Sequence, residues 1–140
     1  MGISKLAATL KLGEKEASVL LKQYKKMTPY LADLSKKVQA SGMEKGYIRT
    51  LLGRRLAMDY EKPYKALNKL IQGSAADQTC MALVQAYREK LPILFSVHDE
   101  IVLRSRTKED ALKVKSIMEG IANLEVPSYT DISEGDSWGG

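Results

Sequence analysis

The sequence has too few cysteines for a disulfide scaffold, and it lacks the long apolar runs of membrane spans and the pattern of an export signal. Cys80 is the single cysteine in 140 residues, which excludes an internal disulfide. Its place in a helical pattern predicts a small buried side chain with no chemical role. No apolar run reaches the length of a membrane-spanning helix, and the amino terminus lacks the layout of a secretory signal. We therefore expect a cytoplasmic protein.

What the chain does contain is typical of one soluble globular domain with a sizeable core, since 44% of its residues are hydrophobic and 28% are charged. The net charge of +5 is unevenly spread. Lys and Arg are dense up to Arg55, whereas the segment after Lys115 has acidic residues and neither Lys nor Arg. A solvated lysine-rich helix face explains this pattern, and from charge alone it is the better explanation. A surface for nucleic acid is the leading functional alternative.

The order of sequence patterns predicts an α+β chain with an antiparallel sheet. Helical spacing of apolar residues predicts helices over residues 14–26, from Thr28 to Gly42, from Pro63 to about Lys90, and from Thr107 onward. Alternating patterns predict hairpins over residues 46–58 and 91–104 and a last strand over residues 126–132.

The second predicted hairpin carries the most informative residues of the chain. Asp99 and Glu100 follow the only histidine, His98, in a tight bend between apolar runs that are predicted to bury the hairpin stem. Two adjacent carboxylates at a turn repel each other unless a cation or a basic group neutralises them, and Mg²⁺ prefers such oxygen ligands. A solvated surface turn is the alternative, since Asp-Glu pairs are common there.

Four segments together resemble the carboxy-terminal end of the family A DNA polymerases, the DNA polymerase I type. They are Gly-Tyr-Ile-Arg-Thr-Leu-Leu-Gly-Arg-Arg at 46–55, Gln-Gly-Ser-Ala-Ala-Asp at 72–77, Val-His-Asp-Glu at 97–100 and Gly-Asp-Ser-Trp at 135–138. They occur in the family's order, and residues 2–4 resemble those that follow the tyrosine of the family's fingers helix. Four motifs in register make coincidence a poor explanation.

The resemblance implies a catalytic role for Asp99 and Glu100 in a two-magnesium site. Asp99 would be the second of two palm aspartates that bind the metal ions, and Glu100 would support the site. The first aspartate has no match in this chain, so the resemblance implies that a partner segment completes the site. His98 would approach the primer terminus, although a packed hairpin residue is an equally good interpretation.

The resemblance also implies contacts with a primer-template. Asn68 and Gln72, four residues apart on one helix face, would read the minor-groove edge of the base pairs. Arg54 and Arg55 would neutralise DNA phosphates without reading sequence. Exposed helix polarity is the alternative for the first pair, and a solvated face is the alternative for the arginines.

Two further residues match the family's motifs without an expected contact with substrate. Asp77 lies one helical turn beyond Gly73 and is expected to be structural. Trp138 is expected to pack on the palm. At Tyr64 the family often has an arginine toward the template, so the lysines at 62, 65 and 69 are candidates to replace that contact.

The resemblance predicts an incomplete part of a polymerase right hand, with remaining fingers helices over residues 1–45 and a palm portion over residues 46–140. We expect it to work with DNA, deoxynucleoside triphosphates and an amino-terminal polymerase fragment, in bacterial or virus-infected host cytoplasm, and to be inactive alone. A noncatalytic DNA-binding or regulatory module with the same fold is the alternative function. A stand-alone metal-dependent nuclease is a weaker third, because the chain has one acidic cluster.

Overall fold

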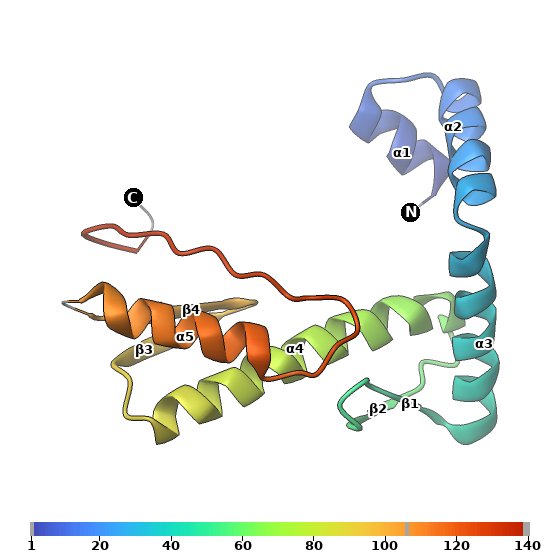
Figure 1. The fold of residues 1–140 in the computed structure, drawn as a ribbon. Helices are drawn as coiled ribbons and strands as arrows, with labels where there is room; N and C mark the ends of the chain where they lie inside the picture. Colours follow the sequence, from blue (N-terminus) through green and yellow to red (C-terminus); the bar gives the residue numbers. More distant parts are fainter. Residues whose placement is uncertain (1, 106, 139–140) are drawn as a thin grey trace. The chain divides into compact units, whose positions relative to one another are not determined.

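The computed structural model describes residues 2–105 and 107–138, and Figure 1 shows their helices and strands. These residues divide into two compact units. The first unit takes in the residues up to Ile48 together with Ala57–Leu67. The second takes in Arg49–Leu56 and the residues from Asn68 onward. Helices and two small antiparallel hairpins make up the chain, which confirms the α+β class. The division at residue 45 into fingers and palm parts stays a prediction.

The first unit begins with helices α1 (Ile3–Leu10) and α2 (Glu14–Met27), which pack against each other. Helix α2 was predicted and α1 was not. The start of α2 is fixed by Glu16, whose carboxylate accepts a hydrogen bond from the Gly13 N–H at 3.1 Å. Ala7 and Ala17 are buried. Small side chains of this kind let two short helices approach closely.

Helix α3 (Pro29–Lys45) starts where the Thr28-Pro29 pair predicted. It runs past Gly42, the predicted end, and stops at Gly46, which has a φ of +75°. Gly42, inside the helix, leaves room for the side chain of Met58. A Cβ there would lie 2.8 Å from the Met58 sulfur.

Strands β1 (Tyr47–Arg49) and β2 (Arg55–Ala57) form the first predicted hairpin. A 3₁₀ turn, η1 (Pro63–Lys65), then leads into the long helix α4 (Ala66–Arg88). Helix α4 passes through Gly73 without a break. Beyond its last residue, Arg88, the chain turns at Lys90, which has a φ of +58°, and the Leu91 N–H donates to the Ala86 carbonyl.

Strands β3 (Ile93–Val97) and β4 (Glu100–Leu103) form the second predicted hairpin, and helix α5 (Lys108–Gly120) follows. The predicted strand over residues 126–132 is wrong, because these residues have no regular secondary structure. Side chains bind its backbone instead. The Thr130 N–H donates to Glu119 at 2.7 Å, and Lys115 donates to the Thr130 carbonyl.

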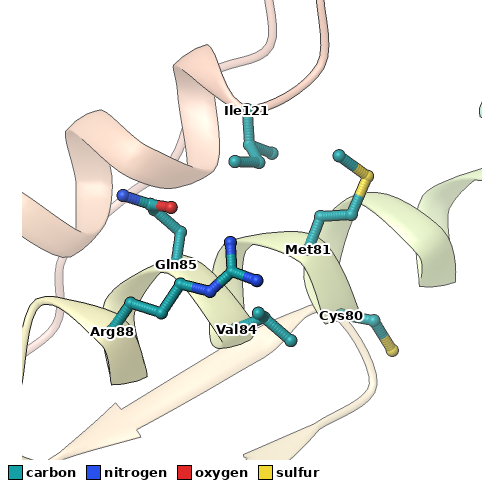
Figure 2. A pocket seen from close by; sticks show the side chains of 6 residues that line it. All are labelled: Cys80, Met81, Val84, Gln85, Arg88 and Ile121. Atoms are coloured by element: carbon teal, nitrogen blue, oxygen red, sulfur yellow. The ribbon is translucent and has the colours of Figure 1, made fainter.

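The prediction that Cys80 is buried is also wrong, since this thiol is exposed on α4. It borders an open groove of about 350 Å³ (Figure 2). Five further residues of α4 and the end of α5 line the groove: Met81, Val84, Gln85, Arg88 and Ile121. None of the predicted site residues belongs to it. Within residues 2–105 and 107–138, no helix is both long and apolar enough to cross a bilayer.

Candidate catalytic hairpin and polar face of helix α4

The register of the second hairpin places His98 and Asp99 in its two-residue turn. Val97 pairs with Glu100, so Glu100 is the first residue of β4 and lies outside the turn that the sequence predicted for it. His98 has a φ of +54°. The tight turns of two-residue hairpins require such a positive φ at their first central residue, and glycine usually supplies it. A histidine here strains the backbone next to Asp99.

The carboxylates of Asp99 and Glu100 are exposed, and so is His98. Throughout the described part of the chain, no hydrogen bond or ion pair engages either carboxylate. Two adjacent oxygen donors with no other partner fit a hard divalent cation, but they fill only part of its coordination shell. The same described residues contain no group of three or more side chains that could hold a metal ion.

The stem of this hairpin is not buried as the sequence predicted. Leu94 is 55% exposed and Phe95 is 40% exposed. Two strands alone have no second layer to cover their apolar side chains. On Phe95 the ring of Trp138 supplies one contact, with the ring planes nearly perpendicular.

Asn68 and Gln72 lie on α4 with the predicted four-residue spacing, and both are exposed. Within the range that the structure describes, neither amide has a hydrogen-bond partner. Their donors and acceptors are therefore available to a ligand. Exposure alone does not distinguish a groove-reading pair from ordinary helix polarity, so their role stays a prediction.

Arg54 and Arg55 follow the turn of the first hairpin and differ in their surroundings. Arg55 begins β2 and is exposed. The Arg54 Nε lies 2.5 Å from Asp77 Oδ1, and its Nη2 donates to the Gly73 carbonyl at 3.2 Å. Asp77 thus has the structural role expected from the sequence. Arg54, expected to contact DNA phosphate, is bound to α4 through two of its nitrogens.

Sequence reasoning missed Thr50 and Ser74, two buried hydroxyl residues at this junction. Thr50 Oγ1 donates to Asp77 Oδ2 at 2.7 Å, and Ser74 Oγ accepts from the Leu51 N–H at 3.0 Å. Their places inside two of the matched motifs were the available signal. Among the described residues, no hydrogen bond or ion pair joins this junction to the turn at His98 and Asp99.

Comparison with known proteins finds relatives among DNA polymerases. A DNA-directed DNA polymerase of Pseudomonas phage M6 is 38% identical over 89% of the chain, which covers 20% of that polymerase. The thermostable DNA polymerase I of Thermus aquaticus is 30% identical over 99% of the chain, which covers 19% of it. The chain thus spans about a fifth of the length of these relatives.

A solved structure and a family model agree with these relatives. The POL domain of Pol1 from M. smegmatis, solved in complex with DNA primer-template and dNTP, superimposes with a TM-score of 0.75 and 30% identity. The match covers 90% of this chain and 26% of that one. The model of DNA polymerase family A matches residues 1–140. The chain therefore belongs to DNA polymerase family A.

Proposed function

We propose that this chain supplies one metal-binding aspartate and contacts with the minor groove and the DNA backbone for DNA-directed DNA synthesis. The observation that carries the proposal is the adjacent pair Asp99 and Glu100, exposed at a hairpin end and bound to no other side chain among residues 2–105 and 107–138. Family membership and a structural neighbour solved with primer-template and dNTP support DNA and deoxynucleoside triphosphates as partners.

In this proposal Asp99 holds Mg²⁺ through its carboxylate, and Glu100 adds negative charge that favours binding of the cation. The chemistry that a bound pair of magnesium ions supplies is Lewis-acid stabilisation of the attacking and leaving oxygens. Asp99 cannot surround two ions alone. A second carboxylate therefore comes from the amino-terminal polymerase part, either joined to this chain or as a separate fragment, and the chain alone is inactive.

The remaining site residues hold the primer-template. His98, next to Asp99 in the turn, approaches the primer terminus. Asn68 and Gln72 donate to minor-groove acceptors that every base pair presents in similar places, so they test pairing geometry rather than sequence. Arg55 places positive charge near the DNA backbone. Its neighbour Arg54 has its guanidinium bound to Asp77 and to the Gly73 carbonyl. We place this work in bacterial or virus-infected host cytoplasm.

Primer extension with Mg²⁺ tests the proposal in three arms: this chain, an amino-terminal polymerase part with the missing motifs, and the two together. Synthesis is expected only in the combined arm. Asp99→Asn should abolish synthesis there, while Asp131→Asn, which changes an exposed carboxylate of the terminal segment, should not.

Two outcomes would contradict the proposal. Full synthesis with Asp99→Asn would remove the metal-binding role of this carboxylate. DNA binding by the combined arm without any synthesis would instead favour a noncatalytic module that has kept the polymerase fold.

A further inference from the structure

Both oxygens of the Asp77 carboxylate are used, and both bonds go to the turn of the first hairpin. Oδ2 accepts a hydrogen bond from Thr50 Oγ1 at 2.7 Å, and Oδ1 accepts from Arg54 Nε at 2.5 Å. The Asp77 side chain is 13% exposed and Thr50 is 3% exposed. The Arg54 side chain is 51% exposed, so the bond between Thr50 and Asp77 is the one shielded from water, and it should hold the turn most firmly.

The same junction continues through the backbone. Thr50 Oγ1 also accepts from the Arg54 N–H at 2.9 Å, which closes the turn on itself. Arg54 Nη2 reaches the Gly73 carbonyl, and the Leu51 N–H reaches Ser74 Oγ. Three positions of the turn are thereby bound to three positions of α4. We call this set, residues 50, 51, 54, 73, 74 and 77, the turn–helix clamp.

The close approach in the clamp depends on the absence of a side chain at Gly73. A Cβ there would lie 2.5 Å from Leu56 Cδ1 and 3.2 Å from Thr50 Cγ2. The hairpin therefore rests against the backbone of α4 at the residue that follows Gln72. Any shift of the turn would change the spacing between Arg55, at the start of β2, and the polar face of α4.

We propose that Asp77 is a positioning residue for DNA binding and that Arg54 acts through the clamp rather than as a phosphate ligand. Asp77 holds the Arg54 guanidinium, and this fixes the register between Arg55 and the Asn68–Gln72 face. The inference rests on the proposed function, because it concerns how Arg55, Asn68 and Gln72 are positioned to contact DNA. It also gives the two arginines different roles in DNA binding: Arg55 contributes positive charge, and Arg54 holds the turn in position.

Asp77→Asn distinguishes an effect of charge on DNA affinity from an effect of geometry, because the two predict opposite changes. The substitution removes one negative charge near the DNA surface, so charge alone would leave binding unchanged or tighten it. Loss of the clamp predicts weaker binding, by roughly tenfold if one charge-assisted hydrogen bond is lost. The slope of log affinity against log salt should stay at the wild-type value, since no phosphate contact is removed.

Arg54→Lys supplies the second test. Lysine keeps the charge but lacks the planar fork that serves Asp77 and the Gly73 carbonyl together. The clamp predicts that Arg54→Lys binds DNA as weakly as Asp77→Asn, with an unchanged salt slope. Arg55→Ala should lower the slope by about 0.9, the value for one phosphate contact.

The experiment measures fluorescence anisotropy of a labelled primer-template with this 140-residue chain at several salt concentrations, and then primer extension with the amino-terminal part present. In extension, Asp77→Asn should raise KM for primer-template and leave kcat within about twofold, because binding in ground and transition states falls alike. Thermal unfolding identifies a variant that fails to fold. In that case Thr50→Val, with Thr50→Ser as the conservative rescue, is judged by the same criteria.

Wild-type or tighter DNA binding by Asp77→Asn, or wild-type DNA binding by Arg54→Lys, would overturn the inference. The anisotropy arm needs no synthesis, so it separates this failure from a failure of the proposed function. If the wild-type mixture makes no DNA but Asp77→Asn still weakens binding, the clamp stands and the catalytic proposal falls.

Discussion

The ring of Trp138 meets the ring of Phe95 edge to face, with centroids 5.5 Å apart and an interplanar angle of 89°. Such pairs contribute about 0.5–1.5 kcal/mol beyond the area they bury. We expect Trp138→Ala to lower the free energy of unfolding by about 1 kcal/mol and Trp138→Phe to lower it less. Thermal denaturation followed by far-UV circular dichroism measures both. Tyr129→Ala, at an aromatic that is 85% exposed in the same segment, is the control and should have little effect.

Replacement of His98 by glycine should separate stability from activity. The φ of +54° disfavours any residue with a Cβ, so His98→Gly should stabilise the fold by about 0.5–1 kcal/mol. Primer extension by the combined polymerase should fall, since the proposed contact with the primer terminus is lost. Lys90→Gly, at a φ of +58° in the turn that follows α4, should give the same stabilisation with activity unchanged. An active His98→Gly would show that the turn needs this backbone shape and no imidazole.

Two helical glycines should respond to alanine with opposite signs. Helix propensity favours alanine by about 1 kcal/mol at either site. At Gly120 a Cβ meets nothing within 4 Å, so Gly120→Ala should stabilise. At Gly73 the Cβ would crowd Leu56, and overpacking of this kind costs about 1–3 kcal/mol. Gly73→Ala should therefore be net destabilising in urea denaturation. An increase in stability would mean that Leu56 moves aside freely.

Two glutamines on α4 should give complementary phenotypes. Gln72→Ala removes an exposed amide and should leave stability unchanged while it lowers kcat/KM in primer extension by about tenfold. Gln78 donates to the Met118 carbonyl at 3.0 Å and to Ser128 Oγ at 3.1 Å. Gln78→Ala should cost about 1–2 kcal/mol of stability and leave kcat/KM near wild type at 25 °C. If Gln72→Ala changes neither quantity, ordinary helix polarity is the better explanation for that side chain.

Local sequence patterns were sufficient to predict the helices and hairpins that have a clear periodic spacing of apolar residues. Helices α2 and α4 and both hairpins lie where apolar spacing placed them. Helix α3 was expected to end at Gly42, but it continues to Lys45 and stops at Gly46, which has a φ of +75°. The strand predicted over residues 126–132 failed for a tertiary reason. Its pattern suits a strand, but Glu119 and Lys115 of α5 bind its backbone at Thr130 instead. Helix α1 was missed because eight residues give little periodicity to detect.

In the candidate site, too, some features could be predicted from local sequence and others depended on tertiary packing. Motif matches identified Asp99 and Asp77, because acidic residues inside them are easy to recognise. The partners of Asp77 were not predictable, since Thr50 is 27 residues away and meets it only after the hairpin packs on α4. The one-residue difference in the hairpin turn had a similar origin. Asp99 occupies the turn in either register. Strand pairing decides whether His98 or Glu100 lies beside it, and local composition suited either.

The exposed thiol of Cys80 gives the native sequence a spectroscopic use. Cys80 is the single cysteine and Trp138 the single tryptophan, so one thiol-reactive dye labels one position on α4 and the indole is a unique energy-transfer donor. The efficiency of transfer from Trp138 to the dye reports how far the terminal segment stays from that helix. Docking of this segment can therefore be followed while DNA or another polypeptide is titrated in, without any engineered residue.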